Sequence, residues 1–172
     1  MIIRQEAQAD YEAVYRVVLE AFLAAEHTDG TEQDLVAALR RSEAFVPELS
    51  LVADEGGVVV GHVLLTQARV GKSSVPTLAL APLSVLPAFQ RQGIGAALVR
   101  EGHRIAGSLG YAWSIVLGDA RYYTRFGYAP ALDFGIEAPF EVPSENFMAC
   151  RLREDAPAVS GMVNYAPEFG IA

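Results

Sequence analysis

Three residues whose types and spacing suit anion binding stand near the middle of the chain: Gln90, Gly93 and Gly95. They form a Q-x-x-G-x-G pattern that follows an apolar run and leads into the helix-forming residues 96–98. The first amides of a helix have no intrahelical partner and carry the positive end of the helix dipole, and glycines let a phosphate approach the backbone. The pattern therefore predicts an anion site at a strand-to-helix turn.

Two other phosphate-binding patterns compete with this interpretation. A dinucleotide site requires G-x-G-x-x-G or G-x-G-x-x-A, but Leu98 occupies the last position of that pattern. A P-loop requires a glycine where Thr66 stands ahead of Gly71-Lys72-Ser73, and Pro76 follows where a helix is needed. A tight strand-to-helix turn that binds no ligand remains the alternative to an anion site.

The elements that must position this turn can be read from hydrophobic periodicity. Apolar and β-branched runs predict strands over residues 2–5, 49–54, 58–69, 77–85, 113–117 and 147–152. Apolar residues at helical spacing predict one helix after Asp10, a short one after Thr31, and a third from the glycine turn to Gly110. The strand over 77–85 carries no charge, so we expect it to be buried on both faces.

Length and charge limit the classes of function. The chain has 172 residues, 52% of them hydrophobic and 20% charged, which is typical of a globular protein with a sizeable core. Its 13 Lys and Arg against 21 Asp and Glu give a net charge of -8. That balance argues against nucleic acid as a partner and weakly favours a cationic acceptor, although solubility alone accounts for it better.

The cysteine and histidine content argues against a metal site. Cys150 is the only cysteine of the sequence, so an internal disulfide is excluded, and the histidines share no ligand spacing: His27, His62 and His103.

We also expect no signal peptide and no membrane segment. The N-terminus has no small-residue cleavage site, and prolines interrupt the uncharged stretch 73–90. The sequence thus predicts a cytoplasmic protein with one domain over 1–172, on which the tail 155–172 packs.

Three separated features occur in an order that resembles the GNAT superfamily of N-acetyltransferases. They are the Q-x-x-G-x-G turn, the preceding Leu83-Ser84-Val85 with Pro87 two residues later, and the segment Tyr-Tyr-Thr-Arg-Phe-Gly-Tyr over 122–128. The resemblance spans residues 1 to about 153 and is nearest to a bacterial subgroup with a Tyr-Tyr-x-Arg-Phe-Gly signature. It implies an α/β (α+β) fold with a mixed, largely antiparallel sheet and helices on both faces. It also implies a cofactor cleft where strand 78–85 parts from strand 113–117.

The resemblance also implies the site residues. Acetyl-CoA would be bound, without a metal, by residues of the splayed strand, of the glycine turn and after the fifth strand: Leu83, Ser84, Val85, Gln90, Arg91, Gln92, Gly93, Ile94, Gly95, Ala96 and Asp119. Family members often place an asparagine where this chain has Gly118-Asp119, so the contact by Asp119 is a departure from the family pattern. Tyr123 takes the position of the general acid.

The implied reaction is transfer of an acetyl group to a primary amine of a small molecule or a protein, by direct attack in a ternary complex. The amine must be neutral, and the sequence offers Glu20, Glu26, His27 and His62 as bases, with a water chain as the alternative; we expect His62 to pack within the fold rather than to act. A non-catalytic acyl-CoA-binding or sensing domain is the competing hypothesis. A monomer and a homodimer both fit the sequence.

Overall fold

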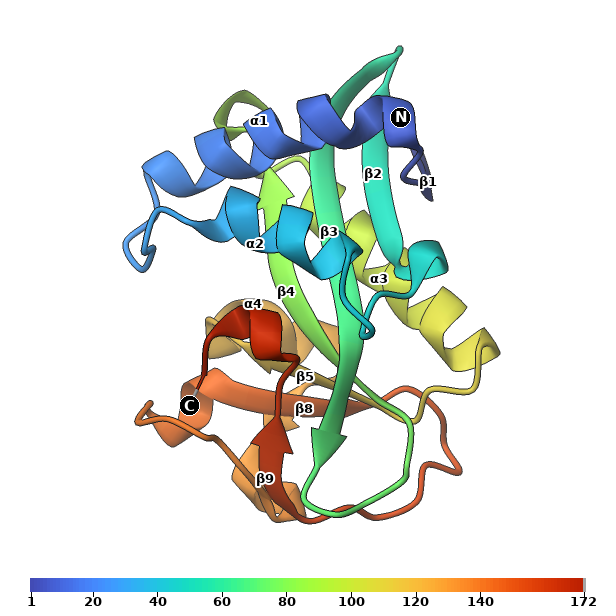
Figure 1. Ribbon diagram of the computed structural model, residues 1–172, viewed down its shortest axis with the longest axis vertical. Helices are drawn as coiled ribbons and strands as arrows, with labels where there is room; N and C mark the ends of the chain where they lie inside the picture. Colours follow the sequence, from blue (N-terminus) through green and yellow to red (C-terminus); the bar gives the residue numbers. More distant parts are fainter. Residues whose placement is uncertain (172) are drawn as a thin grey trace.

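A twisted sheet runs through the centre of the molecule, with α1 and α2 on one face and α3 on the other (Figure 1). The structure is a computed structural model, and it describes residues 1–171. The helices are α1 Tyr11–Leu23, α2 Glu32–Arg40, α3 Ile94–Ser108 and α4 Ala120–Tyr123. The strands are β1 Ile2–Gln5, β2 Ser50–Glu55, β3 Val58–Val70, β4 Thr77–Val85, β5 Trp113–Leu117, β6 Ala129–Pro130, β7 Ile136–Glu137, β8 Phe147–Arg151 and β9 Gly161–Asn164.

The strand order is β1-β2-β3-β4-β5-β8-β6, and the pairing along it is antiparallel except between β4 and β5. The family resemblance predicted a mixed, largely antiparallel sheet with helices on both faces, and this fold is confirmed. The bounds predicted for β4 and β5 match the structure, whereas β2 and β3 each end one residue later than predicted and β8 ends one residue earlier.

The parallel pairing of β4 with β5 is short. It joins Thr77 to Trp113, Leu78 to Ser114 and Ala79 to Ile115, and it ends there. The rest of β4 keeps its partner β3 on one side and diverges from β5 on the other. The burial of β4 follows this geometry, because its first four residues are buried while Leu83 and Val85 are partly exposed. The expectation of a strand buried on both faces is therefore wrong for the splayed half.

Alternation along β3 divides the core between the two faces of the sheet. Gly61 lies against α3, where a Cβ would stand 3.1 Å from Leu98 and 3.2 Å from Ile94. Leu64 packs instead with Val14 and Val18 of α1. Burying each such side chain stabilises the fold by about 1.5–3 kcal/mol, so both helix layers are held mainly by apolar packing.

The C-terminal segment returns to the sheet. β9 pairs antiparallel with the end of β3, joining Arg69 to Asn164 and Val70 to Val163, and it pairs parallel with β7. Val163 is buried. Within residues 1–171 no helix is both long enough and apolar enough to cross a membrane. The same residues contain no group of three or more His, Cys, Asp or Glu side chains arranged to hold a metal ion.

Candidate active site

The glycine turn connects the splayed end of β4 to α3. A short 3-10 turn over Pro87–Phe89 is followed by Arg91, a non-glycine residue with a φ of 63°, and by Gly93 with a φ of 85° at the N-cap of α3. Gln90 fastens this turn to the strand, because its Nε2 donates a hydrogen bond of 3.0 Å to the Val85 carbonyl. The backbone of the turn is thus fixed against β4, with the unpaired amides of the α3 N-terminus beside it.

The two glycines are required for different reasons. A Cβ at Gly93 would meet nothing within 4 Å, but the positive φ of this residue is one that strains any larger side chain. Gly95 has ordinary helical geometry, and a Cβ there would lie 2.5 Å from the Tyr122 hydroxyl. The sequence suggested that both glycines admit a phosphate. The structure adds that the missing side chain of Gly95 leaves room for the hydroxyl of Tyr122, which comes from the segment after β5.

A cleft of about 540 Å³ lies at this turn. It is lined by residues of β4, the turn, the start of α3 and the tyrosine segment: Leu83, Val85, Phe89, Gln90, Arg91, Gly93, Ile94, Gly95, Ala96, Tyr122 and Arg125. Most of the residues predicted for the cofactor are therefore brought together. Phe89, Tyr122 and Arg125 were not predicted; the arginine of the Tyr-Tyr-x-Arg-Phe-Gly segment was the available signal for the last of them.

Three predicted cofactor residues do not line this cleft. Ser84 alternates with its neighbours, so its side chain lies on the α1/α2 face, where it is 2% exposed. Gln92 is exposed and donates to the Ala88 carbonyl. Asp119 is the N-cap of α4, where its carboxylate accepts a 2.8 Å hydrogen bond from the Arg121 amide.

The two tyrosines of α4 face different surroundings. Tyr122 lines the cleft, and the Arg125 guanidinium stacks 4.7 Å from its ring centroid. Tyr123, the residue predicted as general acid, does not line the cleft; it packs against Gly118, at which a Cβ would collide with its ring, and it is edge-on to Tyr128. Burial raises the pKa of Tyr123 well above its usual value of 10.0, so its hydroxyl keeps its proton at neutral pH. The Gly118 that departs from the family pattern thus makes room for the Tyr123 ring.

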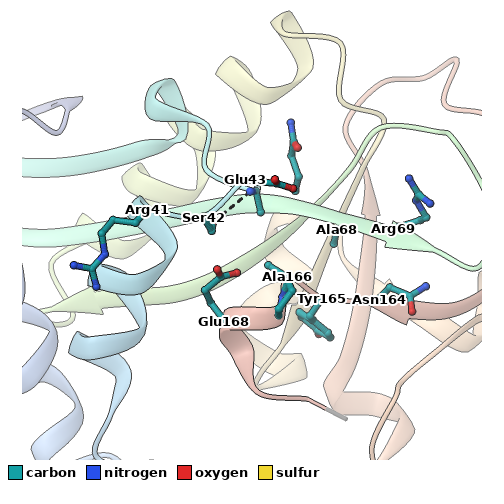
Figure 2. A pocket seen from close by; sticks show the side chains of 12 residues that line it. Arg41, Ser42, Glu43, Ala68, Arg69, Asn164, Tyr165, Ala166 and Glu168 are labelled. Carbon is teal, nitrogen blue, oxygen red and sulfur yellow. Dashed lines mark hydrogen bonds between the residues drawn. The ribbon is translucent and has the colours of Figure 1, made fainter.

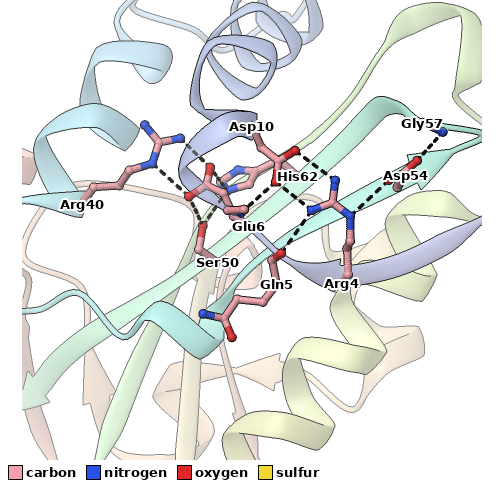
Figure 3. Close-up of polar contacts among 10 residues, drawn as sticks. Arg4, Gln5, Glu6, Asp10, Arg40, Ser50, Asp54, Gly57 and His62 are labelled. Atoms are coloured by element: carbon pink, nitrogen blue, oxygen red, sulfur yellow. Dashed lines mark hydrogen bonds and ion pairs between the residues drawn. The ribbon is translucent and has the colours of Figure 1, made fainter.

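The candidate bases lie away from the cleft. Glu20, Glu26 and His27 are exposed, and none of the four lines the cleft. His62 is fully buried, as expected, and Figure 3 shows it within a polar cluster. Burial, and then the charge of Arg40, lower the pKa of His62 to about 3, so its imidazole is neutral.

The cluster around His62 consists of Glu6, Arg40 and Ser50. Arg40 binds Glu6 through two hydrogen bonds of 3.0 and 2.6 Å, and the Ser50 hydroxyl donates to Glu6 at 2.9 Å. Since the single Ser50 hydrogen is used there, the 3.0 Å contact of Ser50 with His62 requires the Nε2–H of His62 as donor. No sequence pattern indicates this cluster, because its members are distant along the chain.

A separate cavity of about 620 Å³ lies between the end of α2, the end of β3 and the C-terminal segment (Figure 2). Charged side chains of both signs line it: Arg41, Glu43, Arg69 and Glu168. It contains none of the residues predicted to bind the cofactor. Most of those residues line the cleft at the glycine turn instead.

Comparison with known proteins identifies the family. Residues 11–128 match the acetyltransferase (GNAT) family. The chain is 41% identical over 130 residues to the N-acetyltransferase YjhQ of Escherichia coli, a match that covers 74% of this chain and 71% of YjhQ. It is 32% identical to the N-acetyltransferase YhbS of the same organism, over 98% of each chain.

Solved structures agree with this result. The crystal structure of YhbS from Escherichia coli in complex with CoA has a TM-score of 0.88 at 29% identity, with 98% of this chain and 91% of that chain covered. A GNAT family acetyltransferase from Brucella melitensis in complex with acetyl-CoA has a TM-score of 0.81 at 32% identity, with 98% and 97% covered. The resemblance found in the sequence is confirmed, and the chain belongs to the acetyltransferase (GNAT) family.

Proposed function

We propose that this protein is an acetyl-CoA-dependent N-acetyltransferase that moves an acetyl group to a primary amine of a small molecule or a protein. The observation that carries the proposal is the cleft between the glycine turn and the tyrosine segment, beside the splayed half of β4. The bound CoA of YhbS and the bound acetyl-CoA of the Brucella melitensis enzyme support the same ligand for this cleft.

The turn offers a site for the pyrophosphate of CoA. The amides over residues 91–96 include those at the α3 N-terminus, which attract negative charge. Arg91 and Arg125 add two guanidinium groups to the cleft lining. Positive charge and unpaired amides at one place suit a diphosphate, which supports the assignment.

The splayed strand offers a donor for the oxyanion that forms on the acyl group. Leu86 donates its amide to the Val60 carbonyl, so this amide points toward β3. Because successive amides of a strand alternate in direction, the N–H of Val85 points to the opposite edge, where β5 has diverged. We propose that this N–H stabilises the developing negative charge.

Tyr123 is the proposed general acid. The amine nitrogen attacks the thioester carbonyl carbon, the C–S bond breaks, and the sulfur takes the phenol proton of Tyr123; the amine proton leaves to water. The phenol is then reprotonated from solvent. A positioned acid of this kind contributes on the order of 10² to 10⁴ in rate.

The acceptor amine must reach the acyl group in its neutral form. With a lysine-like pKa of about 10.4, roughly one amine in 2,500 is neutral at pH 7, a penalty of about 4.6 kcal/mol. No carboxylate or imidazole lines the cleft among the described residues, so we propose water as the proton acceptor.

Release of free thiol from acetyl-CoA in the presence of a panel of amines tests the proposed function. We expect at least one amine to accelerate thiol release, and Tyr123→Phe to slow single-turnover acetyl transfer while leaving the affinity for acetyl-CoA within a few fold. Binding of acetyl-CoA without thiol release for any amine would favour the non-catalytic domain instead.

Tyr122→Phe is the matched control. It removes an identical hydroxyl one residue away, from a side chain that lines the cleft next to Gly95. We expect it to change the affinity for acetyl-CoA more than the rate of the chemical step. If the Tyr122 variant alone slowed the chemical step, the general acid would be assigned to the wrong tyrosine.

A further inference from the structure

A hydrogen-bonded cluster surrounds Tyr128, the last residue of the tyrosine segment over 122–128, and none of its members lines the cleft. The Tyr128 hydroxyl is 2.9 Å from His103 Nε2 and 2.7 Å from Ser114 Oγ. Tyr128 is 3% exposed and Ser114 is fully buried. These two hydrogen bonds to buried or partly buried partners fix the Tyr128 ring.

The cluster connects the elements that border the cleft. His103 is on α3, the helix whose N-terminus forms the glycine turn, and Ser114 is on β5, opposite Leu78 in the middle of the three pairs that join β4 to β5. Tyr128 follows the turn at Gly127 and is the last residue of the tyrosine segment. The hydrogen bond between His103 and Tyr128 therefore joins α3 to the tyrosine segment, and the bond between Ser114 and Tyr128 joins the same segment to β5.

Aromatic contacts surround the ring of the proposed general acid. Tyr128 meets Tyr123 edge-on, with ring centroids 5.6 Å apart and an interplanar angle of 81°. Tyr122 and Phe126 lie at 5.1 and 6.2 Å from Tyr123, also edge-on. Within residues 1–171 no side-chain hydrogen bond holds the Tyr123 hydroxyl, so packing alone sets its position, and Tyr128 is the neighbour that is itself fixed by hydrogen bonds.

We propose that Tyr128, held by His103 and Ser114, is a positioning residue that fixes Tyr123 for proton transfer; this inference rests on the proposed function. Burial lowers the pKa of His103 to about 4, so its imidazole is neutral at physiological pH and the cluster carries no charge. A neutral cluster holds the ring without a field that would change the acidity of the Tyr123 phenol. Loss of the cluster then displaces Tyr123 rather than altering its chemistry.

Tyr128→Phe is the direct test, because it keeps the ring and removes both hydrogen bonds. A small displacement of a catalytic group lowers rates strongly, so we expect kcat to fall about tenfold while the KM for acetyl-CoA stays within about threefold. In a Tyr123→Phe background the same substitution should lower kcat by less than about twofold, because the residue it positions is already gone.

Equal losses in the two backgrounds would show that Tyr128 acts independently of Tyr123 and would overturn the inference. If Tyr123→Phe alone retained the wild-type single-turnover rate, the proposed general acid would be wrong and the inference would fall with it. Urea unfolding of each variant identifies loss of fold. Should Tyr128→Phe not fold, Ser114→Ala removes one of the two bonds and must show the same dependence on Tyr123, at reduced size.

Discussion

On each face of the central sheet one histidine belongs to a polar cluster, His62 fully buried and His103 partly exposed, and the two clusters differ in charge. On the α1/α2 face His62 contacts Ser50, which binds the ion pair of Glu6 and Arg40, with side chains 1% and 10% exposed. On the α3 face His103 belongs to the uncharged cluster with Tyr128 and Ser114. No residue of the charged cluster lines the cleft, whereas the neutral cluster includes Tyr128 of the tyrosine segment.

The difference separates stability from activity. A buried ion pair is costly to break because the remaining charge is left without a partner, whereas a neutral cluster changes little in electrostatics when one member is lost. We therefore expect substitutions on the α1/α2 face to act on the free energy of unfolding and those on the α3 face to act on turnover or cofactor affinity.

The largest effect is expected for Glu6→Gln. Arg40 would keep its buried charge without a carboxylate, and breaking such a pair destabilises a protein by about 3–5 kcal/mol. Urea unfolding measures this loss, and Glu6→Gln combined with Arg40→Met should lose less than the sum of the single variants. A large fall in kcat of the folded Glu6 variant would remove the separation between the two faces.

The next effect is a loss of stability in mild acid, to which both faces contribute. The folded pKa values are about 3 for His62 and about 4 for His103, against 6.5 for the unfolded residue. Between pH 6.5 and about 4 the unfolded chain binds protons that the folded chain does not, so the free energy of unfolding falls as pH falls.

Chemical denaturation at pH 7.5 and pH 5 measures this dependence. We expect a loss of about 2 kcal/mol per histidine between these values, and no further contribution from them above pH 7.5. His103→Gln should remove about half of the dependence. An unchanged dependence in that variant would mean that folding does not lower the pKa of His103.

A smaller effect is expected on the cofactor side from Gly95→Glu. The substitution adds a side chain and a negative charge beside the proposed pyrophosphate site, so affinity for CoA should fall more than tenfold without unfolding. Calorimetry measures it. Gly95→Ala is the matched variant, and because its Cβ would meet the Tyr122 hydroxyl, Tyr122→Phe should restore part of the affinity that Gly95→Ala loses.

The smallest effect is expected for Asp119→Ala. The carboxylate caps α4, and loss of an N-cap residue lowers the free energy of unfolding. Asp119→Asn keeps a capping oxygen and should lose less. Titration with CoA separates capping from the proposed cofactor contact, since unchanged affinity in both variants would leave Asp119 with a structural role alone.

Local pattern was sufficient to predict the glycine turn and six of the nine strands, β1 to β5 and β8, whereas the short strands β6, β7 and β9 were missed. β4 and β5 were bounded correctly because both are uncharged, largely apolar runs with proline or glycine close to their ends, and the turn was recognisable because its spacing is contiguous. The same information located most of the cleft lining. Features that depend on a few consecutive residues and on backbone geometry, such as strand ends and the glycine turn, could thus be predicted.

Contacts between distant residues could not be predicted in this way. Glu6 and Arg40 are 34 residues apart, and nothing in either neighbourhood marks the other as its partner. The orientation of two adjacent tyrosines was equally hidden, because Tyr122 and Tyr123 differ only in which side of a single helical turn they occupy. The reason for a glycine at position 118 is visible only in the structure, where the Tyr123 ring occupies the space that a side chain would fill.

The short seam between β4 and β5 has a mechanical consequence. Three residue pairs join the half of the sheet that contains β4 to the half that contains β5, and the cleft has walls from both halves, Leu83 and Val85 on one and Tyr122 on the other. A ligand that fills the cleft would therefore contact both halves of the sheet and stabilise their relative position. At a free concentration one hundred times its dissociation constant, such a ligand raises the free energy of unfolding by about 2.7 kcal/mol. The supply of acyl donor would then govern how long each copy of the protein survives proteolysis, as well as how fast it works.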